Sequence, residues 1–284
     1  MQSTQDTPPV MKNPLTQILP VALLAVSITA QAASTQCPQH YLKGQAPDFI
    51  NAKLKQGTQE MCNEAFVAMH SSISKTPLWS AEHLTPDSVA AARTMERHND
   101  FHPDDRLSIG QRAELNDYKR SGYDRGHMAP SGDMPSSQAQ FESFSLANMV
   151  PQAPKLNQGL WSDIEEGLRR YVSNGNDVYV LTGPLFKGAQ IQRLNGQVMV
   201  PTHVYKLVWD VRAQAGVAYL AENIDTTQYS LLSVQQMEQF AGLNFLPGVN
   251  PSNKGRKLDL PQPKKRSRKT PGYEIVEWTP PANR

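Results

Sequence analysis

SFSLANMVPQAPKLNQGLWSDIEEGLR, residues 143–169, changes its apolar period halfway along, and this change predicts the fold at the centre of the chain. Up to Gln152 the apolar residues recur at nearly alternate positions, which predicts a strand that ends near Pro151. These residues are Phe144, Leu146 and, less regularly, Met149. Beyond Pro151 they recur at helical spacing, which predicts a helix that stops at Gly175. The helical set is Leu160, Ile164, Leu168 and Val172.

Further strands and a second helix are predicted after this stretch. Residues 177–183, DVYVLTG, indicate a buried strand, and residues 203–224 favour two strands around a turn at Gln214 to Gly216. Residues 233–248 predict a helix, with Ser233 as its cap and Gly242 as its stop.

The earlier part of the chain is less decisive. Residues 86–98 favour a short helix or turn, and residues 48–75 leave strand and short helix open. Strands that pair through hairpins, with helices on their faces, imply a mixed α/β or α+β domain.

The first 32 residues have the pattern of an export signal. Lys12 precedes the apolar run LPVALLAVSITA, and Ala30-Gln31-Ala32 is a small-x-small cleavage pattern, so we expect cleavage after Ala32. Met11 is an alternative start. The apolar run is short for a membrane span. We therefore expect export to the periplasm or the medium, without a membrane anchor on the mature chain.

The mature chain is long enough for one large domain. We expect that domain over residues 33–250, followed by a basic, proline-containing tail over 251–284. Cys37 and Cys62 are the two cysteines, and an even pair in an exported protein most simply forms one disulfide. Two separate buried thiols are the alternative.

Positive charge is concentrated near the end of the chain. Residues 254–269, KGRKLDLPQPKKRSRK, hold eight basic residues and one acidic residue, a net charge of +7. Such a strip could hold a polyanion with a salt-sensitive affinity. A solvated tail is the alternative, because basic runs flanked by prolines are often disordered.

Polar residues with catalytic potential gather in the central block. The GxSxG, GxxxxGK[ST] and GxGxxG motifs are missing from the sequence, as are zinc-type cysteine clusters. Asn157 and Glu165 are eight positions apart, so on a helix they differ by only about 80° around the axis and can face one cleft. An amide oxygen suits Mg²⁺, which keeps most of its waters.

A histidine and an arginine precede this helix in YDRGHMAPSGDM, residues 123–134. His127 could remove a proton from water near neutral pH, and Arg125 could neutralise charge on a phosphoryl group. By spacing alone this assignment is only suggestive, because a lone histidine in a turn is more often structural.

DYKRSGYDRGHMAPSGDM, followed by residues 143–169, closely resembles the DNA/RNA non-specific endonuclease family. That family includes endonuclease G and belongs to the ββα-metal superfamily. The matching block runs from about Trp79 to Pro247 and keeps the order and spacing of the DRGH tetrad, Asn148 and the LNQGLW…E helix. The resemblance implies a ββα-metal fold with a central antiparallel sheet flanked by helices.

The resemblance also implies the catalytic roles. His127 would be the general base that activates water, and Arg125 would stabilise the scissile phosphate. Asn157 would be the direct protein ligand of a single Mg²⁺, with Mn²⁺ as an alternative metal, and Glu165 would hold one of the metal's waters. The metal would neutralise the departing 3′ oxygen, and the implied products are 5′-phosphorylated oligonucleotides.

Other residues take supporting roles under the same resemblance. Asp124 would brace the DRGH turn, and Asn148 would shape the His127 side of the site. Arg97 matches the family's upstream arginine, with Arg93 as the rival, because the local spacing differs. We predict that Trp161 is a core anchor rather than a base-stacking residue.

The sequence thus predicts an exported, Mg²⁺-dependent endonuclease that cuts DNA and RNA with little sequence preference. One alternative is a protein of the same fold that binds nucleic acid without cutting it. Another is a phosphodiesterase for small diesters. The sequence leaves open the preference for DNA or RNA, a homodimer, and an inhibitor protein as a partner.

Overall fold

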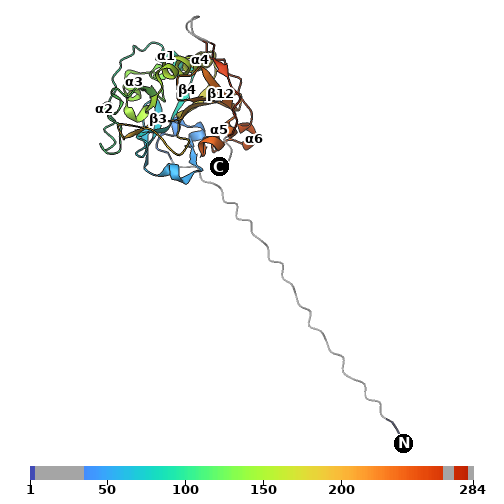
Figure 1. Cartoon of the computed structure of the whole chain (residues 1–284). Helices are drawn as coiled ribbons and strands as arrows, with labels where there is room; N and C mark the ends of the chain where they lie inside the picture. The colour runs from blue at the N-terminus through green and yellow to red at the C-terminus, as the bar shows by residue number, and fades with distance from the viewer. Residues whose placement is uncertain (4–34, 265–271, 281–284) are drawn as a thin grey trace. The chain divides into compact units, whose positions relative to one another are not determined.

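An eight-stranded sheet forms the centre of the unit built by Ala32–Arg284 (Figure 1). The computed structural model describes residues 1–3, 35–264 and 272–280. Neighbouring strands are antiparallel except for the parallel pair β12 and β14. In sheet order the strands are β14 (Glu274–Ile275), β12 (Gln228–Leu232), β11 (Ala215–Glu222), β10 (His203–Asp210), β7 (Val178–Leu185), β4 (Thr76–Leu84), β3 (Phe66–Ser71) and β2 (Thr58–Cys62). The predicted α+β class is confirmed.

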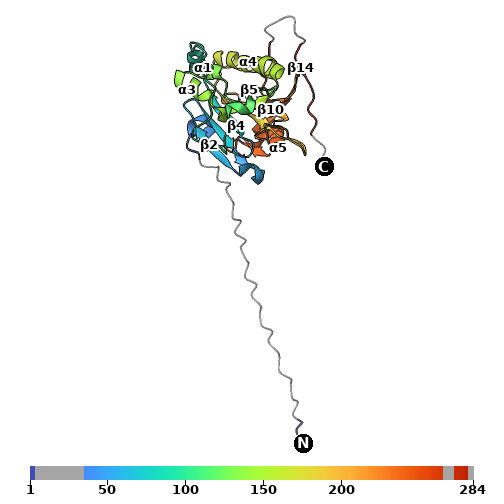
Figure 2. The same cartoon turned by 60° about the vertical axis from the view of Figure 1, so that its left-hand side comes forward.

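Helices cover both faces of this sheet (Figures 1 and 2). On one face lie α1 (Pro86–Ala92), α3 (Ser137–Ser143) and α4 (Ser162–Ser173), and α5 (Val234–Ala241) packs on the other. Along β10 the side chains of Val204 and Val208 pack on the α4 side, whereas Tyr205 and Trp209 pack on the α5 side. Because both faces are buried, the central strands are apolar almost throughout.

The clearer predictions after residue 175 are confirmed. Strand β7 begins at Val178, one residue later than predicted. Strands β10 and β11 are joined by a turn over 211–214, slightly before the predicted one, and Gln214 takes a φ of 49° in it. The side-chain oxygen of Ser233 accepts a hydrogen bond from the Gln236 N–H at the start of α5, and Gly242 ends that helix with a φ of 73°. A positive φ costs glycine little, which suits this stop.

The central strand prediction is only partly right. Of residues 140–152, only Met149–Gln152 form a strand, β6, and the preceding residues belong to α3 and to a 3₁₀ turn, η5 (Leu146–Asn148). Ser136 caps α3 by accepting a hydrogen bond from Ala139 N–H. The alternating apolar residues are all buried, but they reach the core from a helix end, a turn and a strand.

Strand β6 pairs antiparallel with β5 (Asp124–His127), and the chain then enters a helix, which completes a ββα unit. The DRGH tetrad is therefore a strand rather than the predicted turn. Gly126 lies against the buried side chain of Gln152, and a Cβ at Gly126 would lie 2.7 Å from the Gln152 Cβ. The close contact between the two strands requires glycine here.

The predicted helix begins with a π-helical segment, η6 (Leu156–Trp161), and continues as α4. Short π segments are frequent at functional sites because they turn side chains away from ordinary helical positions. Trp161 is 1% exposed and packs with Leu160 and Ile164, so its predicted core role is confirmed.

The structure also contains several shorter elements. They are β1 (Asp48–Phe49), β8 (Arg193–Leu194), β9 (Val198–Met199), β13 (Leu243–Asn244), α2 (Leu115–Tyr118), α6 (Pro251–Lys254), and the 3₁₀ turns η1 (Pro38–His40), η2 (Leu42–Gly44), η3 (Ala52–Lys55) and η4 (Ser131–Asp133). The undecided residues 48–75 thus hold strands and one 3₁₀ turn. The predicted disulfide between Cys37 and Cys62 is present and fastens the N-terminal segment to β2.

The segment 251–284 is not a separate tail where the structure describes it. Lys254 is buried, and its Nζ donates to Glu238 Oε1 at 2.8 Å and to Asn244 Oδ1 at 2.6 Å. Leu258 and Leu260 pack on the α4 side of the sheet. The charge of Lys254, the first residue of the predicted basic strip, is therefore structural, and residues 265–271 lie outside the described part.

The predicted export signal and the choice of Met11 as a start also lie outside the described residues. Among residues 1–3, 35–264 and 272–280, no helix combines the length and apolarity needed to cross a bilayer.

Replacing Gly126 by alanine should destabilise the domain by about 2 kcal/mol, because an added methyl group in a filled core forces its neighbours to move. Thermal unfolding measures the effect. Gly110→Ala is the control, since a Cβ at Gly110 meets nothing within 4 Å. Equal melting temperatures for the two variants would contradict the proposed contact with Gln152.

Candidate active site

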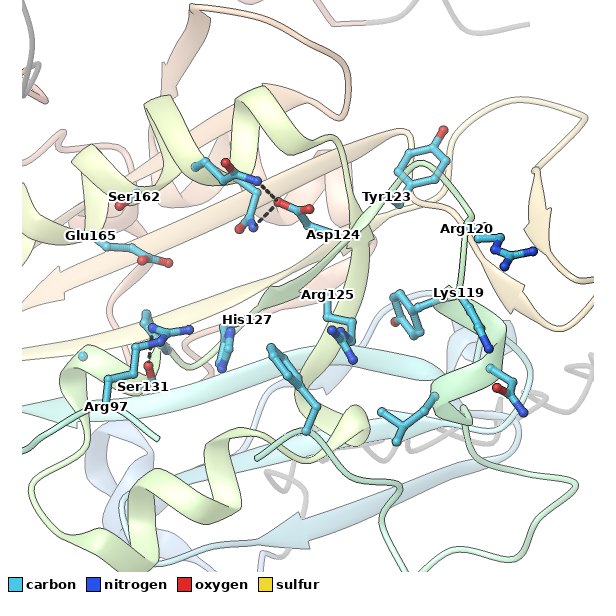
Figure 3. Close-up of a pocket in the computed structure, with 18 of the residues that line it drawn as sticks. Arg97, Lys119, Arg120, Tyr123, Asp124, Arg125, His127, Ser131, Ser162 and Glu165 are labelled. Carbon is cyan, nitrogen blue, oxygen red and sulfur yellow. Dashed lines mark hydrogen bonds between the residues drawn. The ribbon is translucent and has the colours of Figure 1, made fainter. Parts of the chain in front are cut away.

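A cavity of about 900 Å³ opens beside the ββα unit, between β5, the η6–α4 helix and the loop that carries Arg97 (Figure 3). Six predicted site residues line it. They are Arg97, Asp124, Arg125, His127, Asn157 and Glu165. Lys119, Arg120, Gln158 and Arg169 add further polar groups to the wall. The structure therefore brings together residues that lie far apart in the chain, from Arg97 to Arg169.

His127 ends strand β5 and lies near the middle of this cavity (Figure 3). Its ring packs against Phe101 and Phe144, with centroids 5.7 and 4.9 Å away, and its Nε2 is buried without a hydrogen-bond partner among the described residues. Burial, with the positive charges of Arg97 and Arg125, lowers the pKa of His127 from 6.5 to about 3. The imidazole is therefore neutral at physiological pH and can accept a proton.

Two arginines flank His127. The guanidinium of Arg125 lies over the Phe101 ring, 4.0 Å from its centroid, a cation–π contact that fixes the group at the cavity wall. Arg97 donates from Nη1 to Ser131 Oγ at 2.7 Å and from Nε to Asn99 Oδ1 at 2.9 Å. Both guanidinium groups are fixed beside the histidine, where they can neutralise an anionic ligand.

The rival arginine is placed elsewhere. Arg93 lies outside the cavity lining and forms an exposed ion pair with Glu166 at 3.5 Å. Arg97 is thus the upstream arginine that the fold brings to the site.

Asp124 orients the amide of Asn157. Its Oδ2 accepts hydrogen bonds from Asn157 Nδ2 at 2.9 Å and from Gln158 Nε2 at 2.8 Å (Figure 3). A carboxylate only accepts hydrogen bonds, so the amide nitrogen of Asn157 must face Asp124. The oxygen Oδ1 is then left for a ligand. Asp124 therefore braces the helix opposite β5, rather than the turn that was predicted.

Glu165 faces the same cavity from α4 (Figure 3). Burial raises its pKa, while the positive charges of Lys206 and Arg169 lower it and partly offset the burial. Lys206 is 1% exposed on β10, where its Nζ donates to Thr182 Oγ1 at 2.7 Å. The carboxyl group is thus held beside buried cations in a partly dry environment.

Asn148 does not line the cavity. It is 1% exposed, and its amide makes four hydrogen bonds, with Ser80 Oγ, Ser143 O and both backbone groups of Ala129. Because all of these partners are protein groups, Asn148 positions the chain that follows His127 and contacts no cavity ligand.

Sequence reasoning missed Arg169 and its partner Asp133. Arg169 Nη1 donates to Asp133 Oδ1 at 2.7 Å, and both side chains are almost fully buried. Burial opposes the charge of Arg169, but Asp133 and Glu165 outweigh it and raise its pKa. A usable signal existed, since Arg169 follows Glu165 by four positions and so shares its helix face.

The donor set suits a hard cation that needs few protein ligands. Asn157 offers an amide oxygen that accepts no hydrogen bond from another described residue, and Glu165 offers a carboxylate at the same cavity. Among the described residues, the group of three metal-type ligands is Cys37, Glu60 and Cys62, and its sulfurs are joined in the disulfide. Mg²⁺, which keeps most of its waters, fits a site with one amide and one carboxylate.

A strand pair, a following helix, and a histidine opposite an amide and a carboxylate define a ββα-metal nuclease. A family model for the DNA/RNA non-specific endonucleases matches residues 45–252. The chain belongs to this family and is a hydrolase of the nuclease class.

Relatives are found in fungi, animals and bacteria. Nuclease C1 of Cunninghamella echinulata var. echinulata is 34% identical over 213 residues, which cover 68% of this chain and 84% of that protein. The mitochondrial endonuclease G of Homo sapiens is 31% identical over 205 residues, covering 66% and 69%. A nuclease of Nostoc sp. is 29% identical over 259 residues, covering 81% and 92%.

A solved structure has a similar fold. The crystal structure of the EndoG/EndoGI complex, described as giving the mechanism of EndoG inhibition, matches with a TM-score of 0.61 at 28% identity. The match covers 73% of this chain and 92% of that one.

His127 should remain neutral at pH 5 in the metal-free protein, because its pKa is about 3 instead of 6.5. Nitrogen-15 NMR of the imidazole rings, followed against pH, measures the protonation directly. Arg125→Met should move the His127 titration to higher pH, since it removes one of the two neighbouring charges. A wild-type ring that gains its proton near pH 6.5 would contradict the burial of this group.

Proposed function

We propose that the protein is an exported, Mg²⁺-dependent endonuclease that hydrolyses DNA and RNA with little sequence preference and leaves 5′-phosphorylated ends. One observation carries the proposal. A neutral imidazole, His127, lies in one cavity with two fixed guanidinium groups, an oriented amide oxygen and a carboxyl group. These are the groups that water attack on a phosphodiester requires.

In this mechanism His127 takes the proton from the attacking water. A base with a pKa near 3 is weak, but the arginines that depress this pKa lie where they would meet the phosphate. When the substrate's negative charge offsets theirs, the pKa of His127 rises towards the working pH and the histidine becomes a better base. Substrate binding thus activates the base.

Arg97 and Arg125 hold the phosphate and stabilise the charge that grows on its oxygens. Both side chains are fixed before substrate arrives, Arg97 by Ser131 and Asn99 and Arg125 by Phe101. Groups that need no reorganisation stabilise a developing charge well in a partly dry site.

Asn157 and Glu165 would hold the metal, Asn157 directly through Oδ1 and Glu165 through a water. When bound, Mg²⁺ supplies positive charge that stabilises the departing oxygen. Asp124 keeps the amide of Asn157 turned with its oxygen outward, and Lys206 and Arg169 favour the charged form of Glu165. Asp124, Lys206 and Arg169, which act on the two metal ligands, thereby set the orientation and charge of those ligands.

Low sequence preference follows from the chemistry of the cavity wall. Its charged members suit phosphate groups, which are the same in every sequence and in both DNA and RNA. The disulfide between Cys37 and Cys62 supports export to the periplasm or the medium, because such bonds persist in oxidising compartments.

His127→Ala should lower cleavage of supercoiled plasmid and of RNA by a factor of about 10² to 10⁴, the usual contribution of a general base. Cleavage is measured with Mg²⁺ and with EDTA, which should stop the wild-type protein. His102→Ala is the control, because His102 stacks on Phe141 at 4.2 Å and lies outside the cavity lining. A fully active His127→Ala variant would refute the assignment.

Asp124→Asn should weaken Mg²⁺ binding by about 10- to 100-fold, since metal affinity depends on groups that orient the ligands. An asparagine can place its NH₂ group where Asp124 now accepts two hydrogen bonds. Titration calorimetry with Mg²⁺ alone measures the change. Asp87→Asn, an exposed position in the first turn of α1, controls for loss of charge. Equal affinities in the two variants would show that Asp124 does not orient the ligand.

A further inference from the structure

The cavity extends well beyond the groups that the proposed reaction uses. Figure 3 shows Glu165, Ser162 and Arg97 on one side of His127, and Lys119, Arg120 and Tyr123 on the other, beyond Arg125. All of these residues belong to the same cavity lining. At about 900 Å³ the cavity is at the upper end of the range for small-molecule sites, so it has room for more than one phosphodiester group.

Lys119 and Arg120 are the basic residues at this second end of the cavity, and neither side chain has a partner in the part of the chain that the structure describes. Both are exposed, and no hydrogen bond or ion pair joins either side chain to another described residue. Arg97 and Arg169, by contrast, are fixed by Ser131 and Asp133. The charges of Lys119 and Arg120 are therefore free to meet an anionic ligand.

The preceding residue supplies an unused polar group. Tyr118 is 5% exposed and lines the cavity, yet its buried hydroxyl has no hydrogen-bond partner among the described residues. Buried polar groups without partners are rare and costly. Burial raises the pKa of Tyr118, so the hydroxyl keeps its proton and can donate a hydrogen bond to an oxygen.

The backbone conformation of Arg120 also indicates a functional role for its side chain. Arg120 has a φ of 58°, in the left-handed region that only glycine enters at little cost. The carbonyl of Tyr118 accepts the Ser121 N–H at 3.2 Å, which closes this turn. Glycine would adopt this conformation at a lower energetic cost, so an arginine here introduces backbone strain. Such strain is typical of functional positions, which agrees with a contact between Arg120 and substrate.

We propose that Tyr118, Lys119 and Arg120 form a second phosphate-binding subsite for the backbone of a nucleic-acid strand, one or more nucleotides away from the phosphate held at His127. The hydroxyl and the two cations would contact phosphate oxygens, and Arg125 lies between the two subsites (Figure 3). The subsite rests on the proposed nuclease function, since it would bind the same strand that is cleaved at His127. It gives the enzyme a preference for polymers over single diesters.

Equilibrium binding of a labelled 20-nucleotide single-stranded DNA, measured in EDTA over a series of salt concentrations, tests the subsite without cleavage. Lys119→Ala/Arg120→Ala should weaken binding by about tenfold or more, as expected for two charged contacts. The slope of log Kd against log salt should fall by about 1.4, because each phosphate contact on a single strand contributes about 0.7. Lys53→Ala/Lys55→Ala removes the same charge from exposed residues of η3, outside the cavity, and should have neither effect.

Two single variants exclude a folding defect. Arg120→Gly should fold at least as stably as wild type, because glycine accepts the φ of 58°, and should still weaken binding. Tyr118→Phe keeps the ring and loses only the unpartnered hydroxyl, so it should retain the melting temperature and weaken binding about threefold. Unchanged binding by Tyr118→Phe would overturn the role given to the hydroxyl.

Cleavage kinetics separate this proposal from the proposed function. With Mg²⁺ and plasmid DNA, Lys119→Ala/Arg120→Ala should raise KM about tenfold and leave kcat within about twofold, because the reacting groups are intact. If wild type cuts DNA and this variant matches the Lys53/Lys55 control in Kd and KM, the subsite is refuted while the nuclease function stands. If wild type binds DNA through Lys119 and Arg120 but cuts nothing, the nuclease function fails and the subsite stands.

Discussion

The close contact between Gly126 and Gln152 is the constraint on which the site depends. Without a side chain at Gly126, strand β5 can lie against β6 and over the buried Gln152. The two neighbours of that glycine then project towards the cavity as Arg125 and His127, and Asp124 reaches the amides of the following helix. One missing Cβ therefore fixes the base, the phosphate clamp and the orientation of the metal ligand together.

Burial and neighbouring charges together set the pKa values of the ionisable groups at the site. Burial, with the positive charges of Arg97 and Arg125, lowers the pKa of His127. Burial raises the pKa of Glu165, and the charges of Lys206 and Arg169 offset only part of that rise. Burial, followed by the negative charge of Asp133, raises the pKa of Glu82, a fully buried residue of β4. Five basic residues line the cavity, which therefore favours anions, although the chain as a whole carries 28 basic and 26 acidic residues.

The sequence predicted those features that local rules determine. The α5 helix was found because a serine cap and a glycine stop act within a few residues, and β10 and β11 were found because their turn and apolar runs are contiguous. The stretch before β6 was misjudged because buried residues at alternate positions also occur where a helix end and a turn meet a strand. Arg169 shares the helix face of Glu165, but its ion pair with Asp133 and the position of Lys206 near Glu165 depend on contacts between distant elements, which spacing along the chain does not contain. His127, Asn157 and Glu165 were found from the family resemblance more than from their spacing.

The parallel strand β14 has a consequence for the rest of the sheet. It pairs with β12, the last strand of the antiparallel series, and Tyr273 beside it donates a hydrogen bond to Asp163 of α4 at 2.6 Å. An uncovered edge strand presents a row of unsatisfied backbone groups to any other chain that can pair with it. The C-terminal segment thus covers the edge of β12 and hinders edge-to-edge association with another chain. The hydrogen bond from Tyr273 holds this segment to α4, the helix that carries Glu165.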